Sequence, residues 1–130
     1  MLNYIMTLGV DLSVKPIPIS SSNTVELYVF DMSGEQMYAD LRKHCGSHAN
    51  MIIAAFDITH RSTYINAKQW IQDIKDINNN RYLTGVLVAC KSDLKEYSDI
   101  NLKDAADYAR SIGFEYMECS AADAKNTDET

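Results

Sequence analysis

The chain has 130 residues, of which 46% are hydrophobic and 23% are charged. This composition is typical of one globular domain that is long enough to bury a core. The net charge is −6 and no basic run occurs, which argues against nucleic acid or an anionic membrane surface as the main partner. No apolar run approaches ~18 residues, so the sequence predicts no transmembrane segment.

The first third of the chain predicts two extended segments joined by a turn. Residues 10–19 are rich in apolar side chains but include Pro16 and Pro18. Because proline cannot donate to a strand ladder, this segment is expected at the edge of a sheet. A serine-rich turn at residues 20–23 leads into residues 25–31, whose β-branched and aromatic side chains predict a second strand, antiparallel to the first.

The rest of the chain alternates apolar strands with helices. Residues 36–45 predict a short, irregular helix. Met51–Asp57 is continuously apolar up to its last residue, as expected of a parallel strand that is covered on both faces. Residues 85–90 predict another buried strand, and residues 114–119 a final short one.

Two amphipathic helices are predicted between these later strands. The first is expected to begin at a capping Ser62 and to end at the asparagines 78–80. The second is expected to be capped by Asn101 and stopped by Gly113. The apolar faces consist of Tyr64, Ala67, Ile71 and Ile74 in the first helix and of Leu102, Ala105, Ala106, Ala109 and Ile112 in the second.

Strands that alternate with crossover helices predict an α/β fold with a doubly wound, mostly parallel sheet, here in one domain over residues 1–130. Ligands of such sheets bind beyond the carboxyl ends of the strands. The predicted strand ends carry D-M-S-G from Asp31, the carboxylate of Asp57, C-K-S-D around Lys91 and C-S-A around Ser120. This clustering is a stronger signal than any single motif.

The first part of the chain carries residues suited to a metal-bound phosphate. Asp31 and Gly34 form D-x-x-G, in which the carboxylate can hold Mg²⁺ through a water and the glycine N–H can approach a terminal phosphate. Thr7, just before the first strand, offers a hydroxyl that can ligate Mg²⁺. Each signal alone is weak, because D-x-x-G also occurs by chance as a turn.

The later part carries residues suited to reading a guanine base. The carboxylate of Asp93 can accept two parallel N–H bonds from guanine N1 and N2, a donor pair that adenine lacks. The stem of Lys91 can cover the base plane. The backbone N–H groups around Ser120 and Ala121 can meet the guanine O6.

In this order, the motifs make residues 4–121 resemble a Rab-type small GTPase. Y-I-M-T-L-G-V-D is similar to the family's effector loop, F-D-M-S-G to W-D-T-A-G, C-K-S-D-L to N-K-x-D and E-C-S-A to E-x-S-A. The resemblance implies that GTP or GDP is bound with Mg²⁺. It implies Thr7 and Asp31 at the metal, and Gly34, Lys91, Asp93, Leu94, Ser120 and Ala121 at the nucleotide.

The resemblance is closer to an atypical branch of this family, the Rab-like GTPases of the intraflagellar transport B complex. L-G-V-D-L-S-V-K-P-I-P-I, V-E-L-Y-V-F-D-M-S-G and G-V-L-V-A-C-K-S-D-L are similar to the pattern of that branch. The branch implies a switch or scaffold subunit in the cytoplasm and in the cilium or flagellum. It implies the small β-sandwich subunit of that complex and other complex B subunits as protein partners.

Three departures from the family pattern bear on activity. The sequence contains no G-x-x-x-x-G-K-[ST] phosphate-binding loop, so nucleotide affinity is expected to be weakened. Glu35 stands at the family's catalytic glutamine position, where its carboxylate repels a terminal phosphate and predicts slow hydrolysis. Cys90 stands where the family has asparagine.

By analogy with the family, the chain begins inside the effector loop, lacks the central strand of the sheet and stops before the final helix. Two strands are then expected to have unpaired edges, and the chain alone to be less stable than a full domain unless a partner completes it.

Two other interpretations of the function stay open. The sequence also fits a nucleotide-free interaction module, or a fragment of a general Rab trafficking GTPase.

Cys90 and Cys119 are expected at neighbouring strand ends, where buried small side chains are favoured over a redox pair. The three cysteines have no paired spacing, which fits a reducing compartment.

Overall fold

The computed structural model describes residues 6–79 and 82–127. The chain divides into two compact units, Met1–Gly46 and Ser47–Thr130. Among the described helices, none combines the length and the hydropathy that a membrane span requires.

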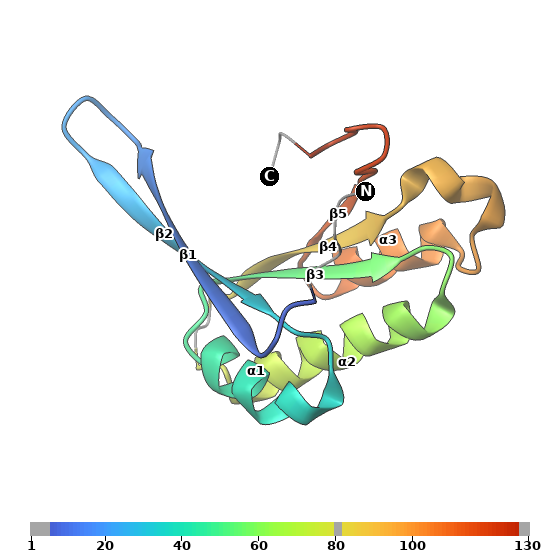
Figure 1. Cartoon of the computed structure of the whole chain (residues 1–130), viewed down its shortest axis with the longest axis horizontal. Helices are drawn as coiled ribbons and strands as arrows, with labels where there is room; N and C mark the ends of the chain where they lie inside the picture. Colours follow the sequence, from blue (N-terminus) through green and yellow to red (C-terminus); the bar gives the residue numbers. More distant parts are fainter. Residues whose placement is uncertain (1–5, 80–81, 128–130) are drawn as a thin grey trace. The chain divides into compact units, whose positions relative to one another are not determined.

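The first unit is built on a long antiparallel hairpin (Figure 1). Strand β1 (Val10–Pro18) pairs with β2 (Thr24–Met32) along its full length. Ser20 shapes the turn, because its hydroxyl accepts a hydrogen bond from the N–H of Asn23 at 3.2 Å. Both predicted strands and their antiparallel pairing are confirmed.

Both faces of this hairpin carry exposed apolar side chains. Residues that pair across the two strands lie on the same face, and neighbours along a strand alternate between faces. Two strands alone are at best marginally stable in water. One face carries Leu12, Val14, Tyr28 and Phe30, the other carries Ile17, Val25, Leu27 and Val29, and each of these residues is between 41% and 54% exposed.

The first unit ends in a short helical segment. Gln36–Tyr38 forms a 3-10 turn, which continues into helix α1 (Ala39–Gly46). The irregular helix that the sequence predicts over residues 36–45 is therefore confirmed.

The second unit is a parallel three-stranded sheet in the order β3-β4-β5 (Figure 1). Its strands are β3 (Met51–Asp57), β4 (Thr84–Cys90) and β5 (Glu115–Glu118). Helix α2 (Arg61–Ile77) connects β3 to β4, and helix α3 (Leu102–Ser111) connects β4 to β5. The predicted α/β class, with parallel strands interleaved with helices, is confirmed.

Both helices pack on the same face of this sheet. The ring of Phe56 on β3 meets Tyr64 on α2 at 5.0 Å between centroids, and Tyr64 meets Tyr108 on α3 at 6.3 Å. At Gly85 on β4, an added Cβ would lie only 2.3 Å from the ring of Phe114, so the ring needs glycine beneath it. The core lies on this face and includes the buried residues Ile52, Ala54, Ile71, Ile74, Leu87 and Ala109.

The predicted burial of β3 on both faces is wrong for the described residues. Ile52, Ala54 and Phe56 point to the core, but Met51 and Ile53 are 52% and 60% exposed. The reason is that β3 is the outer strand of its sheet and α2 and α3 cover only one face. In the described part of the chain, β3 therefore has an open edge and an uncovered apolar side.

The predicted helix ends are confirmed in part. The side chain of Asn101 caps α3 by accepting from the N–H of Lys103 at 3.0 Å, and Gly113 follows the helix with a φ of 77°. The predicted cap at Ser62 is wrong, because α2 already begins at Arg61, with His60 as its N-cap residue. At the other end α2 stops at the predicted asparagines, with Asn78 as its C-cap.

Candidate functional site

The proposed base-reading residues lie at the carboxyl ends of β4 and β5. Ser120 is fully buried, and its hydroxyl donates to Asp93 Oδ1 at 2.6 Å. The N–H of Ser92 donates to the carbonyl of Cys119 at 2.9 Å, which ties the K-S-D segment to the end of β5. Asp93 itself is exposed, so its carboxylate is oriented by the protein while keeping acceptor capacity for a ligand.

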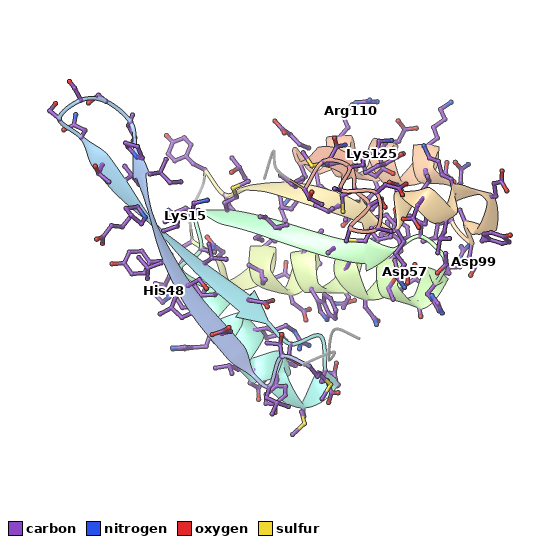
Figure 2. The ribbon with its side chains drawn as sticks, turned by 45° about the horizontal axis from the view of Figure 1, so that its top comes forward. Lys15, His48, Asp57, Asp99, Arg110 and Lys125 are labelled. Atoms are coloured by element: carbon purple, nitrogen blue, oxygen red, sulfur yellow. The ribbon has the colours of Figure 1, made fainter. Side chains whose placement is uncertain are left out.

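Lys91 has a left-handed backbone directly after β4, with φ 63° and ψ 40°. This conformation is uncommon for a residue with a side chain. Its Nζ forms an ion pair with Asp57 Oδ2 at 2.6 Å, and Asp57 lies at the end of β3 (Figure 2). The lysine is thus held between two neighbouring strand ends.

The ion pair stabilises the charged forms of Asp57 and Lys91. Burial alone would raise the pKa of Asp57, but hydrogen bonds from Lys91 and Thr59 hold that pKa far below its usual range. Thr59 supplies its N–H at 2.8 Å and its hydroxyl at 2.6 Å, both to Asp57 Oδ1. The hydrogen bond to Asp57 in turn raises the pKa of Lys91. Both groups are therefore fully charged at neutral pH.

The remaining base-reading residues lie on turns beside Asp93 and Ser120. Leu94 is 37% exposed and its N–H donates to the carbonyl of Lys91 at 2.8 Å. Ala121 is exposed on the loop after Ser120, which folds back because Ser120 and Lys125 exchange backbone hydrogen bonds of 3.1 and 2.9 Å.

The predicted metal residues Thr7 and Asp31 meet in the first unit. The Thr7 hydroxyl donates to Asp31 Oδ2 at 3.4 Å. The N–H of Ser33 donates to the carbonyl of Gly9 at 2.9 Å, which holds the segment after Thr7 beside D-x-x-G. A hydroxyl and a carboxylate are hard oxygen donors of the kind that Mg²⁺ prefers, so this pair fits that ion.

A shallow pocket of about 340 Å³ adjoins this pair. Thr7, Gly34 and Glu35, which the sequence singles out, all contribute to its lining. Because Glu35 places a carboxylate there, the pocket adds negative charge next to any bound anion. The lining residues are Met6, Thr7, Met32, Ser33, Gly34 and Glu35.

Arg42 is a residue that the sequence does not single out. It is only 6% exposed, and its Nη1 donates to the carbonyl of Ser33 at 2.8 Å and to that of Glu35 at 2.6 Å. These carbonyls flank Gly34, so α1 holds the D-x-x-G loop through one guanidinium. No pattern predicts this, because an arginine on a short polar helix is normally exposed.

The predicted site residues thus gather in two groups, each within one unit. The first group consists of Thr7, Asp31, Gly34 and Glu35, and the second of Lys91, Asp93, Leu94, Ser120 and Ala121. Asp57 joins the second group through its ion pair with Lys91.

Comparison with known proteins identifies the class of protein. The profile of the Ras family matches residues 1–130, and the chain belongs to this family of small GTPases. It is 30% identical over 125 residues to the intraflagellar transport protein 27 homolog of Mus musculus. It is 29% identical to the proteins of the same name from Trypanosoma brucei brucei, over 118 residues, and Bos taurus, over 125 residues.

These alignments cover 95%, 91% and 95% of this chain but 67%, 63% and 67% of the mouse, trypanosome and bovine proteins. The chain therefore spans about two thirds of the length of these relatives. The family that the motifs predict is confirmed.

Proposed function

We propose that this chain binds a guanine nucleotide and acts as a switch or scaffold subunit of intraflagellar transport. The observation that carries the proposal is the exposed Asp93 carboxylate, which the buried Ser120 hydroxyl orients at the carboxyl end of a parallel sheet. A carboxylate in this position accepts the N1–H and N2–H donors of guanine, and an adenine would leave it unpaired.

The other members of the second unit have supporting roles in this proposal. The alkyl stem of Lys91 flanks the base, because its ammonium is anchored by Asp57. Leu94 lies beside the base-reading carboxylate. The backbone N–H of Ala121 is the donor proposed for the guanine O6.

In the first unit, Thr7 and Asp31 would hold Mg²⁺, and the N–H of Gly34 would meet the terminal phosphate. When bound, Mg²⁺ neutralises charge on the phosphates of a nucleotide. Glu35 lines the same pocket, and its carboxylate cannot donate a hydrogen bond to a phosphate or to a water, as a glutamine amide can. We therefore propose that hydrolysis is slow.

The transport role rests on the three relatives, all named intraflagellar transport protein 27 homologs. The proposal places the chain in the cytoplasm and the cilium. Its proposed partners are the small β-sandwich subunit of complex B and other subunits of that complex. We further propose that residues 1–130 act as one domain once the open strand edges are covered.

One observation favours a second candidate, a protein-interaction module that binds no nucleotide. The β1–β2 hairpin has apolar side chains on both faces, including Val14, Tyr28, Leu27 and Val29, all at least 41% exposed. Such surface is typical of a protein contact.

Binding of fluorescent GDP in the presence of Mg²⁺ separates the two candidates. We expect wild type to bind GDP in preference to ADP, and Asp93→Ala to lose binding. Asp107→Ala is the matched control, because Asp107 is an exposed carboxylate that pairs with Arg110 on α3, away from the candidate site. If wild type and Asp93→Ala bind equally poorly, the nucleotide-free module is the better description.

A further inference from the structure

The thiols of Cys90 and Cys119 lie next to each other at the ends of β4 and β5. Their Sγ atoms are 3.7 Å apart, and both cysteines are free and partly exposed. The sequence favours buried small side chains here, and the structure leaves both residues only partly exposed.

The backbone places the two residues directly opposite each other. Ala89 pairs with Glu118 in the parallel register, so the next residues along are Cys90 and Cys119. The N–H of Cys119 donates to the carbonyl of Ala89 at 2.9 Å, which continues the ladder by one step. Neighbouring strands lie about 4.8 Å apart, and a disulfide accepts Cα separations of about 4.4–6.8 Å. The usual strand spacing is therefore compatible with a disulfide, which would form by rotation of the two side chains.

We propose that Cys90 and Cys119 form a dithiol that small-molecule disulfides of the glutathione class oxidise to an intramolecular disulfide. The thiolate of Cys119 attacks the reagent, one thiol leaves, and a mixed disulfide forms. The thiolate of Cys90 then attacks the Cys119 sulfur, and the second thiol leaves. In sum, the protein loses two hydrogen atoms and one small disulfide is reduced to two thiols.

The surroundings of Cys90 favour its protonated thiol form, so the disulfide forms only when an oxidising disulfide is supplied. Burial and the neighbouring Cys119 raise the pKa of Cys90 to about 12. Cys90 is therefore protonated at neutral pH and is not a general nucleophile. Its proximity to Cys119 makes the second, intramolecular step favourable despite the small thiolate fraction.

The bridge would join the two segments that carry the proposed base-reading residues. Cys90 directly precedes Lys91, and Cys119 directly precedes Ser120. Cys119 already accepts a hydrogen bond from the N–H of Ser92. The disulfide thus closes a covalent loop through α3 and is expected to raise the melting temperature of the chain.

The test is thiol counting and disulfide mapping of the full chain without nucleotide, so its result does not depend on the proposed function. The chain is incubated with oxidised glutathione, quenched with acid, alkylated and analysed by intact mass and peptide mapping. We expect one remaining free thiol, at Cys45, and one Cys90–Cys119 peptide. The oxidised chain should melt at a higher temperature than the reduced chain.

Three variants make the outcome decisive. Cys45→Ser should still form the bridge and retain no free thiol. Cys90→Ser and Cys119→Ser should instead carry glutathione on the remaining cysteine or keep it free. If wild type gives only single glutathione adducts, or links through Cys45, the proposal is overturned.

Discussion

The hydroxyl of the buried Ser120 donates to Asp93 Oδ1 over 2.6 Å. The same hydroxyl accepts from the N–H of Asp123 at 3.1 Å. Ser120 thus joins the K-S-D turn after β4 to the loop after β5. One small side chain both stabilises the second unit and fixes the direction of the carboxylate proposed to read guanine.

Ser120→Ala is expected to affect stability and binding together. Removing the hydroxyl leaves Asp93 and the N–H of Asp123 without this partner, which should lower the free energy of unfolding by about 1–3 kcal/mol. GDP affinity should fall roughly tenfold, about 1.4 kcal/mol. Urea unfolding and fluorescent GDP titration measure the two effects. Ser111→Ala is the control, because the exposed Ser111 hydroxyl bonds to the carbonyl of Tyr108 within α3, and equal effects of both variants would contradict the account.

The ion pair between Asp57 and Lys91 predicts a loss of stability in acid. The pKa of Asp57 is lowered in the folded chain, while an unfolded aspartate has a pKa of about 3.9. The ion pair therefore contributes fully above that unfolded value, and its contribution is lost as the pH falls towards the lowered folded pKa. The raised pKa of Lys91 acts only at high pH, outside this range.

Asp57→Asn should accordingly be less stable than wild type at pH 7, and the difference should shrink as the pH is lowered from 5 to 2. Urea unfolding across this range measures it. Asp107→Asn removes an exposed pair and is expected to show a difference within about 1 kcal/mol at every pH. A constant difference for Asp57→Asn would count against the ion pair as its cause.

Arg42→Met is expected to loosen the D-x-x-G loop. The variant keeps an apolar stem but removes two charge-assisted hydrogen bonds to the carbonyls of Ser33 and Glu35, which should destabilise the first unit by about 2–4 kcal/mol. Hydrogen exchange of residues 33–36 should become faster than in wild type. Arg110→Met, at an exposed arginine on α3, should leave that exchange unchanged. Unaltered exchange in Arg42→Met would show that the guanidinium does not hold the loop.

Glu35→Gln tests the proposed cause of slow hydrolysis. The amide removes a negative charge from the pocket beside Thr7 and Gly34 and offers a donor to a phosphate or a water. Single-turnover GTP hydrolysis should become faster on the order of tenfold. Glu115→Gln, an exposed residue on β5, is the control. An unchanged rate would mean that Glu35 does not limit hydrolysis.

The open edges predict a chain of low stability in isolation. β1 and β2 form a sheet of their own, and β3 has an uncovered edge and an exposed Ile53 in the described residues. Circular dichroism should show a broad melting transition below about 45 °C, the lower end of the usual mesophilic range. A sharp transition at high temperature would refute the expectation.

Much of the fold follows from the sequence, because its signals are local. The Asn101 cap, the Gly113 stop and the antiparallel hairpin depend on residues close in the chain, and all are confirmed. The predicted helix cap at Ser62 is wrong, because a local pattern does not show which of several neighbouring polar residues stands at the start of α2. Several polar residues cluster there, and the hydroxyl of Thr63, bonded to the carbonyls of His60 and Asp57, belongs to the same turn.

The site is predictable in its residue types but not in its supporting contacts. Strand ends indicate Asp93 and Ser120, because parallel strands bring their carboxyl ends to one edge. The Asp57–Lys91 pair and the buried Arg42 depend on side-chain directions that no spacing encodes. The exposed side of β3 was missed because a continuous apolar run does not show which of its faces is covered.

The most direct test of the account is a change of base preference through Asp93. Xanthine has a carbonyl where guanine has its N2 amino group, so an amide donor in place of the carboxylate should exchange the preferred base. We expect wild type to bind GDP over xanthosine diphosphate, and Asp93→Asn to reverse that order in titrations with fluorescent analogues. If Asp93→Asn binds GDP and xanthosine diphosphate with the same affinities as wild type, Asp93 does not read a guanine base.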